Sequence, residues 1–580
     1  MYPNTSPPGN CCSRNNVFDQ ANGKFIRFPG FSGSHGWQWS KRILNLDSSV
    51  WIYDLNKNRW INMLPFPEVS VGPARAVAYD SDNQIILVFN VHEQSKTAVY
   101  DLYANIWTLL YPKKEPPPKL SYNPGFSMVY DSSQKLFVLF GIGDGTDPRT
   151  FTFDIKKNEW EDTQPKTTPT YYKADPLMVY DNKNKASICI VQNKEKSYLE
   201  TWAYDTKKNE WTKMNPPKEP TPTQDRQRQL TYAPDQNLII LENRYSPGHY
   251  SLNEQQIWTY RFAEAPKDNL PKPPQDLKLK ITKNSVRISW KSNAKKFNVY
   301  HGIAKKPWLV NYKKIATAKI NKFIHKNPEK NKIHYYYVTA VDQKNNESAS
   351  SLKVRSQPRA IIDVIISPLS KNKIKISWKT EDKDIQGYNI YRAKTCWRDA
   401  LVWRMNISRT DYGEKLEIAS NFKKINKKAI QRNKFIDKIK LNQIYAYRVH
   451  ALNKLGIESG PSPYILTIPS PPQYIFSKEN GNDCKLRWQK NSEKSIIGYN
   501  VYRMRDRWDD DPELLNKKPI KNTSYIDKNA TENIPREPAN YGRRYYITAI
   551  DFLGQESFPS APVWFYREWH KFYKLGVWHQ

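Results

Sequence analysis

The sequence predicts an all-β protein with two differently built regions, and three observations support this prediction. Tyr and Trp, with 37 and 19 copies in 580 residues, far exceed Met with 7, and this bias favours strands. A unit of about 50 residues recurs through the first half of the chain. A different unit recurs three times in the second half, and internal repeats of this kind decide an architecture. We therefore expect an array of small antiparallel sheets followed by three sandwiches.

The unit of the first half closes with a strand, an Asp, five residues and a Trp. Its four copies are WIYDLNKNRW (51–60), AVYDLYANIW (98–107), FTFDIKKNEW (151–160) and WAYDTKKNEW (202–211). Its opening, a strand, a polar turn and a very apolar strand, occurs at 17–30, 78–90, 129–141, 179–191 and 231–243. Each complete unit predicts four short strands, in which the Asp caps a turn and the Trp packs between sheets. The fifth unit shows no fourth strand.

This pattern resembles Kelch repeats over residues 10–263, and the resemblance implies a β-propeller with five visible blade units. Kelch blades usually carry a Gly pair after the apolar strand, which only FPGFSG (28–33) and FGIGDG (140–145) approach here. In closed propellers an N-terminal strand commonly completes the last blade. The Pro-rich segment before Cys11 is a poor strand, so sequence upstream of residue 1 is a candidate for that role.

The unit of the second half begins with a strand that ends in Trp and continues with two strands that carry Tyr. The first strands are SVRISW (285–290), KIKISW (373–378) and KLRW (485–488). The pattern resembles fibronectin type III domains, which are immunoglobulin-like sandwiches, and it defines module 1 (265–356), module 2 (357–468) and module 3 (469–566). A basic aromatic tail, 567–580, follows them.

The fibronectin type III resemblance implies structural roles for two sets of aromatic residues. The strand-ending tryptophans are buried between the two sheets of each sandwich, and they are Trp290, Trp378 and Trp488. The late-strand tyrosines pack in the core or close a corner by hydrogen bonding to backbone, and they are Tyr336, Tyr447 and Tyr545.

Positive charge is concentrated in the second half. Residues 1–263 carry 30 Lys and Arg against 27 Asp and Glu, whereas 264–580 carry 61 against 30. This asymmetry indicates a polyanionic partner such as an acidic polysaccharide, a cell-surface polyanion or nucleic acid. The alternative is a Lys-rich solvated surface that reflects composition alone. Sequence-specific nucleic-acid recognition is not expected, because no helix-turn-helix, zinc-finger or aromatic RNA-binding signature is present.

Each module carries another Trp beside basic residues, shortly after its Tyr-ending strand. These are Trp308 in AKKPW, Trp397 in AKTCWR and Trp508 in RDRWD. A loop Trp beside Arg or Lys could stack on a sugar ring or pair with an anion. The alternative is a ring folded over the sheet edge or onto the next module.

The least repeat-like segment, 11–39, concentrates Gly, His and Trp in the loops of one predicted blade. Loops on a rigid scaffold commonly carry function. We expect any specific ligand site of this region to include Arg14, Arg27, His35, Trp37 and Trp39. The alternative is an elaborate blade that only closes the propeller.

No catalytic residue, metal site or cofactor is expected. The chain has no Gly-rich phosphate loop, HExxH or GxSxG motif, and its five Cys show no metal-ligand spacing. Cys189 and Cys484 lie in strand patterns and are expected to be buried. Galactose-oxidase-like copper enzymes also combine Kelch blades with sandwiches. The propeller region has only three His, however, and Cys189 is its only internal Cys.

The leading functional hypothesis is a non-catalytic binding or structural protein. Its propeller would present a recognition face to a protein or polysaccharide partner, and its basic modules would anchor it to an anionic surface. The alternatives are a polysaccharide-active or galactose-oxidase-like enzyme with its site in the propeller funnel, and an intracellular Kelch adaptor. Fibronectin type III repeats indicate an extracytoplasmic location. No signal peptide or apolar run long enough for a transmembrane helix is visible, and the oligomeric state is open.

Overall fold

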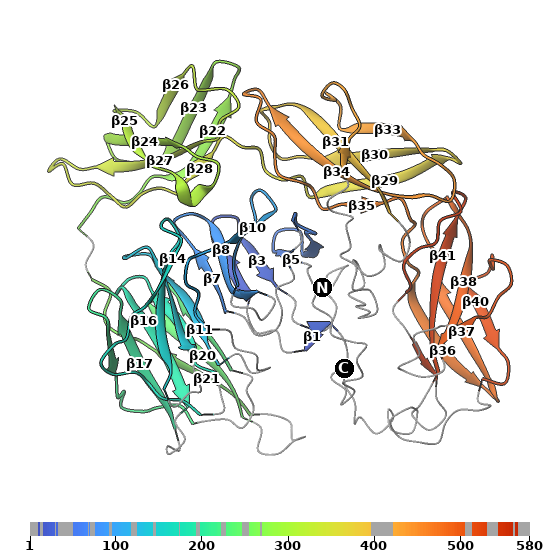
Figure 1. Cartoon of the computed structure of the whole chain (residues 1–580), viewed down its shortest axis with the longest axis horizontal. Coiled ribbons are helices and arrows are strands. Elements are labelled where there is room, and N and C mark those ends of the chain that lie inside the picture. Colours follow the sequence, from blue (N-terminus) through green and yellow to red (C-terminus); the bar gives the residue numbers. More distant parts are fainter. Residues whose placement is uncertain are drawn as a thin grey trace.

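The computed structural model is all-β, as the composition and repeats predict (Figure 1). It describes residues 10–11, 16–28, 31–32, 50–67, 69, 76–91, 96–117, 125–142, 147–172, 175–192, 198–221, 228–245, 254–266, 269–395, 422–504, 513–530, 543–560 and 563–565. Within these ranges the helical structure is one 3₁₀ turn, η1 (Pro307–Leu309). None of the helical structure described here is long and apolar enough to span a membrane. The aromatic tail lies outside the described residues.

Five successive antiparallel sheets form the N-terminal region, in the order the repeats predict. Sheet 1 comprises β2 (Asn16–Asp19), β3 (Lys24–Arg27), β5 (Trp51–Asp54) and β6 (Arg59–Asn62). Sheet 2 comprises β7 (Ala76–Asp80), β8 (Ile85–Val91), β9 (Lys96–Asp101) and β10 (Ile106–Leu110). Sheet 3 comprises β11 (Ser127–Asp131), β12 (Leu136–Ile142), β13 (Arg149–Asp154) and β14 (Glu159–Asp162).

The last two of these sheets differ in strand number. Sheet 4 comprises β15 (Leu177–Asp181), β16 (Ala186–Gln192), β17 (Leu199–Asp205) and β18 (Glu210–Lys213). Sheet 5 has three strands among the described residues, β19 (Arg228–Ala233), β20 (Leu238–Tyr245) and β21 (Glu254–Tyr260). A separate short pair joins β1 (Asn10–Cys11) to β4 (Phe31–Ser32). The fifth unit therefore lacks a fourth strand here, as its sequence predicts.

The repeated Asp and Trp residues have the structural roles that the sequence predicts, namely turn capping and packing between sheets. In sheet 3, Oδ1 of Asp154 accepts the backbone N–H groups of Lys156 and Lys157 at 2.9 and 3.0 Å, so the Asp caps the turn. The last three repeat Trp residues each pack against a Phe of the preceding sheet. The pairs are Trp107 with Phe28, Trp160 with Phe89 and Trp211 with Phe140, with ring centroids 5.8, 5.2 and 4.7 Å apart.

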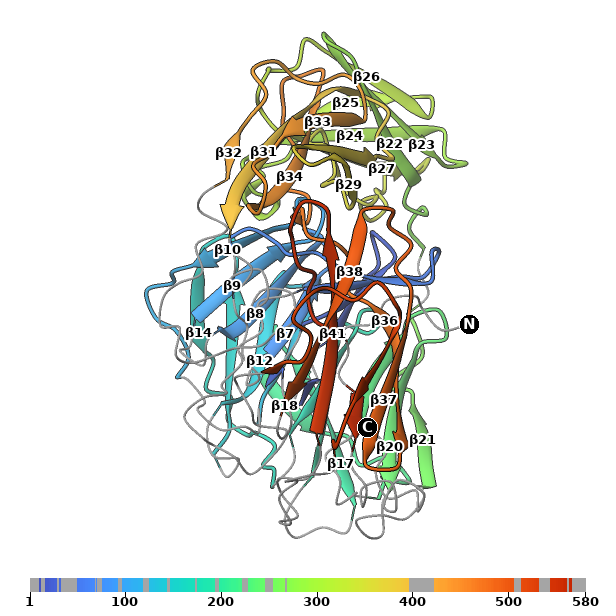
Figure 2. The ribbon, with the colours of Figure 1, turned by 90° about the vertical axis from the view of Figure 1, so that its right-hand side faces the viewer.

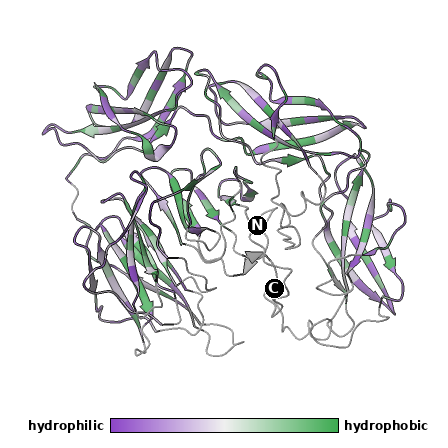
Figure 3. Cartoon of the chain, in the orientation of Figure 1, coloured by the Kyte–Doolittle hydropathy of each residue, from purple (hydrophilic) through white to green (hydrophobic). Residues whose placement is uncertain are grey.

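The five sheets stack through their first strands. β2 contacts β7, β7 contacts β11, β11 contacts β15, and β15 contacts β19. The second strands β12 and β16 are almost wholly buried, because a neighbouring sheet covers each of their faces. Apolar residues accordingly run along the strands and polar residues along the turns (Figure 3).

Three sandwiches follow, each with a three-stranded and a four-stranded sheet. The three-stranded sheets comprise β22 (Gln275–Ile281), β23 (Ser285–Lys291) and β26 (Lys322–Lys326) in module 1, β29 (Asp363–Ser370), β30 (Lys373–Lys379) and β33 (Lys434–Lys438) in module 2, and β36 (Gln473–Asn480), β37 (Asp483–Gln489) and β40 (Ser524–Asp527) in module 3. The four-stranded sheet of module 1 comprises β25 (Lys313–Ala318), β24 (Lys296–Ile303), β27 (His334–Val341) and β28 (Val354–Arg355). That of module 2 comprises β32 (Lys423–Lys424), β31 (Ile385–Thr395), β34 (Ile444–Asn453) and β35 (Ile465–Leu466). That of module 3 comprises β39 (Glu513–Leu514), β38 (Ile496–Met504), β41 (Arg543–Asp551) and β42 (Val563–Phe565).

The predicted core aromatics are buried, with one difference in their hydrogen bonding. Trp290, Trp378 and Trp488 lie between the two sheets of their modules. The three late-strand tyrosines are fully buried, and the hydroxyl group of each bonds a side chain of the facing sheet. The pairs are Tyr336 with His325, Tyr447 with Asp437 and Tyr545 with Asp527.

Consecutive modules are joined by a repeated loop. Leu455 of module 2 packs into the core of module 1, and its carbonyl accepts the N–H of Asn331 at 2.9 Å. Leu553 of module 3 packs in the same way into module 2 and accepts the N–H of Asn442 at 3.0 Å. Figure 2, turned from the view of Figure 1, shows modules 1 and 2 above the N-terminal sheets.

Candidate functional site: a cleft where the two regions meet

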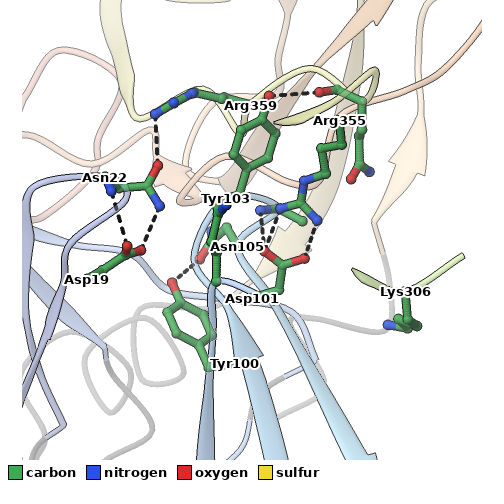
Figure 4. Close-up of polar contacts among 12 residues, drawn as sticks. Asp19, Asn22, Tyr100, Asp101, Tyr103, Asn105, Lys306, Arg355 and Arg359 are labelled. Atoms are coloured by element: carbon green, nitrogen blue, oxygen red, sulfur yellow. Dashed lines mark hydrogen bonds and ion pairs between the residues drawn. The ribbon is translucent and has the colours of Figure 1, made fainter. Parts of the chain in front are cut away.

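The second D-x5-W turn differs from the others and forms the centre of the contact between the two regions. Its sequence is Leu102–Tyr103–Ala104–Asn105, where the third and fourth copies carry Lys-Lys-Asn. The turn itself is conventional. The N–H of Ala104 donates to Oδ1 of Asp101 at 3.2 Å, and the hydroxyl of Tyr100 donates to Oδ1 of Asn105 at 2.9 Å (Figure 4).

The segment that connects modules 1 and 2 (353–363) lies on this turn. Arg355 forms a bidentate ion pair with Asp101, with Nη1 2.7 Å from Oδ2 and Nη2 2.6 Å from Oδ1. Both side chains are about nine-tenths buried. Burial alone would lower the pKa of Arg355, but the adjacent Asp101 carboxylate raises it. Removing one partner of such a buried pair leaves an uncompensated charge and costs about 3–5 kcal/mol. This pair therefore fixes the connecting segment to sheet 2.

Tyr103 is held between two guanidinium groups. The Cζ atoms of Arg355 and Arg359 lie 4.1 and 4.9 Å from its ring centroid. Its hydroxyl donates to the carbonyl of Gln357 at 3.0 Å, and its own carbonyl accepts the N–H of Ala360 at 3.0 Å. Burial raises the pKa of Tyr103 to about 12, so the phenol is neutral at physiological pH.

Module 2 reaches the same turn through its own loop. Nδ2 of Asn105 donates to the carbonyl of Pro461 at 3.0 Å. A Cβ added at Gly460 would lie 1.6 Å from the carbonyl oxygen of Ala104, so only glycine allows this approach of the two backbones. Arg359 adds a contact to sheet 1, with Nη1 3.0 Å from Oδ1 of Asn22.

A cleft of about 620 Å³ with both polar and apolar side chains in its lining opens beside this contact. It is lined by the turns 21–22 and 83–84 of the N-terminal region, residues 276–279 of module 1, the segment 352–359 and the turn 381–385 of module 2. Burial lowers the pKa of Lys353 and raises the pKa of Asp382, which accepts the N–H of Arg359 at 2.8 Å. The described lining holds no His or Cys, and its Arg355 is already paired. The described lining therefore brings the N-terminal region, modules 1 and 2 and their connecting segment together around one cleft, and it does not place a nucleophile beside an imidazole base.

Of the residues predicted to bind a ligand, Trp308 requires a correction. It belongs to η1, is only 6% exposed, and packs with sheets 2 and 3 in a cluster that includes Phe89 and Trp160. Its ring is therefore not available to a sugar. It is packed away as the alternative expected, but against the preceding N-terminal sheets and not against a sheet edge or the next module. Nζ of Lys306 lies 5.8 Å from the Trp308 ring centroid and donates to Oγ1 of Thr108 at 2.6 Å, which adds a polar contact between module 1 and sheet 2.

Among the other predicted site residues the structure describes Arg27, which is not part of the cleft lining. Arg27 is half-buried at the end of β3, opposite Asn16 and Trp51. The remaining six lie outside the described residues: Arg14, His35, Trp37, Trp39, Trp397 and Trp508. Cys189 and Cys484 are buried free thiols, as predicted, and burial raises the pKa of both.

Sequence reasoning missed the residues that join the two regions. The available signal was the departure of Tyr103 and Ala104 from the Lys-Lys of the later copies, because an apolar pair in an otherwise charged turn indicates a covered surface. Nothing in the local sequence identifies Arg355, which lies 254 residues from its partner Asp101. A His group that could hold a metal lies in module 1, outside the lining of the cleft.

No protein-family model matches this chain, and no curated protein matches it. Among solved structures, the FN1–FN3 domains of chicken CNTN1 are 14% identical, cover 51% of this chain and 99% of that chain, and give a TM-score of 0.15. The central fibronectin-III array of RIM-binding protein is 14% identical, covers 52% of this chain and 99% of that chain, and gives a TM-score of 0.20. At these TM-scores neither likeness carries an argument. The fibronectin-III-like character of the second half rests on the strand order of its own three sandwiches.

Proposed function

We propose that this chain is a non-catalytic binding protein whose sandwiches attach it to an acidic polysaccharide or similar polyanion outside the cytoplasm. The N-terminal sheets are, in this proposal, the blades of a Kelch-like propeller that presents a recognition face. The stacking of β2, β7, β11, β15 and β19 in chain order supports the blade assignment. One observation carries the polyanion proposal: the three-stranded sheet of every module has a directly opposed pair of cations, between the first and central strands in modules 1 and 3 and between the central and third strands in module 2.

Each three-stranded sheet places two cations directly opposite each other on neighbouring strands. The pairs are Lys280 with Arg287, Lys373 with Lys438, and Lys478 with Lys485. Five of these six residues are exposed, and Lys485 is half-buried. Within the described part of the chain, the ion pairs found do not include any of the six.

Like charges at directly opposed positions of a sheet destabilise it. Such a pair on one module could reflect composition, but a pair on the three-stranded sheet of every module favours a common cause. A bound polyanion would neutralise the pairs, and the release of its counterions would drive binding. The N-terminal region has almost balanced charge, so we assign the anchoring role to the sandwiches.

The experiment compares the full chain with a variant in which these six residues are replaced by Gln. Retention on a heparin column and the affinity for heparin in solution would be measured over a range of salt concentrations. We expect the wild type to bind with steep salt dependence, and the variant to bind at least about tenfold more weakly with a shallower dependence.

The matched control removes six exposed lysines from the N-terminal region by the same change to Gln. Suitable positions are Lys113, Lys114, Lys166, Lys183, Lys185 and Lys207. This variant has the same net charge as the first, so equal loss of binding in both would show that net charge alone matters and would refute a site on the sandwiches. Absence of binding by the wild type at low salt would refute the anchoring role altogether.

A further inference from the structure

One corner of each sandwich core is closed by a Tyr hydroxyl and two polar side chains. In module 2, Oδ2 of Asp437 accepts the hydroxyl of Tyr447 at 2.7 Å and Nη1 of Arg392 at 2.7 Å. In module 3, the same oxygen of Asp527 accepts Tyr545 at 2.5 Å and Arg503 at 3.0 Å. The corner is therefore an Arg–Asp ion pair that links the two sheets of the module.

Module 1 has the corresponding Tyr, Tyr336, but histidines occupy the positions of the Arg and the Asp. Strand register aligns His301 with Arg392 and Arg503, because each lies opposite the late-strand Tyr. Register also aligns His325 with Asp437 and Asp527, because each lies opposite the corresponding residue of the central strand, Val286, Ile374 or Cys484. A third histidine, His334, enters from β27 two residues before Tyr336.

The three imidazoles converge. One ring nitrogen of each lies within 4.8 Å of those of the other two, and Nε2 of His301 is 2.9 Å from Nδ1 of His334. His334 is fully buried, whereas His301 and His325 are partly exposed.

The outer ring nitrogens already have partners of the kind seen around metal ligands. Nε2 of His334 is 2.8 Å from the carbonyl oxygen of Glu329, a hydrogen bond that requires a proton on Nε2 and leaves a lone pair on Nδ1. Nδ1 of His325 is 2.8 Å from the hydroxyl of Tyr336, and a proton donated there leaves a lone pair on Nε2. The lone pair on Nδ1 of His334 faces Nε2 of His301.

We propose that His301, His325 and His334 bind a divalent transition metal, with Zn²⁺ as the first candidate. Three neutral imidazoles are a known Zn²⁺ ligand set, and water can fill the fourth position through the partly exposed side. Tetrahedral binding at 2.0–2.1 Å places ligand nitrogens roughly 3.3 Å apart, so the observed spacings require only small side-chain movements. The ion would join β26 to β24 and β27, the link that Arg–Asp pairs make in modules 2 and 3. The sequence predicted no metal site, because its cysteines show no metal-ligand spacing and it has no HExxH motif, and these three histidines come together only through strand register.

The test uses the full chain, stripped of metal with a chelator and dialysed. Zn²⁺ would be titrated by calorimetry, and Co²⁺ binding would be followed by the visible absorption of a tetrahedral site. We expect one equivalent of tightly bound ion and a Zn²⁺-dependent rise in Tm. The informative variant is His301→Arg combined with His325→Asp, which installs the ion pair of the other modules. It should fold, lose this binding by at least about 100-fold and show no Zn²⁺-dependent rise in Tm.

Two further variants complete the design. His450→Gln alters a histidine of module 2 whose Nδ1 bonds the carbonyl of Ser459, and it should bind Zn²⁺ like the wild type. His334→Tyr introduces the residue that module 2 carries at this position, Tyr445, and supplies an independent loss of one ligand if the double variant does not fold. Absence of stoichiometric binding by the wild type, or unchanged binding in His334→Tyr, would overturn the proposal.

Discussion

At the scale of single residues, the Asp that opens each tight turn shows how burial changes a repeated position. Asp80 accepts the N–H of Asn83 at 2.9 Å and its Nδ2 at 2.6 Å, which is ordinary turn capping. It is also fully buried, close to Asp82 and Lys353. Burial raises the pKa of Asp80 to about 6, above the ordinary 3.8, despite those two hydrogen bonds.

This shift predicts a pH-dependent effect of Asp80→Asn. A raised pKa in the folded state means that the favourable contribution is complete below pH 3.8 and is lost as the pH rises through 6. Asn does not ionise, so it avoids this loss and still offers an oxygen to the turn. We expect the variant to gain on the order of 2–3 kcal/mol relative to the wild type between pH 4 and pH 7.5. Urea unfolding midpoints at the two pH values measure this, and an unchanged difference between the two proteins would contradict it.

At the scale of elements, one loop decides how the sandwiches are joined. The loop reads Asn453–Glu458 in module 2 and Asp551–Glu556 in module 3, with Leu-Gly at its centre. The corresponding loop of module 1, 342–347, carries Lys-Asn instead, and Lys344 is exposed. The apolar loop therefore occurs where a preceding sandwich covers it, and the polar loop where none does.

Replacing Leu553 by Lys, the residue of module 1, should open the junction between modules 2 and 3. Leu553 is fully buried in the core of module 2, and loss of such a side chain costs about 2–5 kcal/mol. Hydrogen exchange at Asn442, whose N–H donates to the carbonyl of Leu553, should accelerate strongly. Lys344→Ala is the matched control and should leave exchange throughout the modules unchanged. Protection of Asn442 that survives in the Leu553 variant would show that the junction does not depend on this side chain.

At the scale of the whole molecule, the modules arch over the N-terminal sheets (Figure 1). They are held there by the contacts that the turn 101–105 makes with the segment 353–363 and with module 2, which we call the clamp. The clamp includes a buried ion pair, two stacked arginines and a glycine contact from module 2. Three separate segments of the chain thus meet at one turn. We infer that the two regions move as one body while this turn is intact.

Tyr103→Lys with Ala104→Lys gives the turn the sequence of the third and fourth copies, so the turn should still form while the clamp is lost. Two lysines would face Arg355 and Arg359, and like charges in a buried site are unfavourable. We expect a larger radius of gyration in small-angle scattering and faster proteolysis within 353–363. Lys207→Tyr places the same aromatic in the equivalent, exposed turn of sheet 4 and should change neither. An unchanged radius for the double variant would show that other contacts are sufficient.

The sequence by itself determined the local architecture. Strand periodicity, polar tight turns, the capping Asp and the packed Trp depend on interactions within about 50 residues, and they predicted the five sheets and the three sandwiches correctly. The three strands described for the fifth sheet followed from the same pattern. Burial of Trp290 and of Cys484 was predictable because each occupies an inward position of an alternating strand.

Tertiary structure alone decided which surfaces meet. Trp308 has basic neighbours in the sequence, as Trp397 and Trp508 do, yet it is buried because sheets 2 and 3 lie against module 1. The partners Asp101 and Arg355 are 254 residues apart, and His301 and His334 converge only through strand register. Contacts of this kind depend on how finished elements dock. A local change such as Tyr103–Ala104 can indicate that a turn is covered, but it does not identify the residues that cover it. The sequence therefore specified the parts of the molecule, and their packing created both the cleft and the histidine cluster.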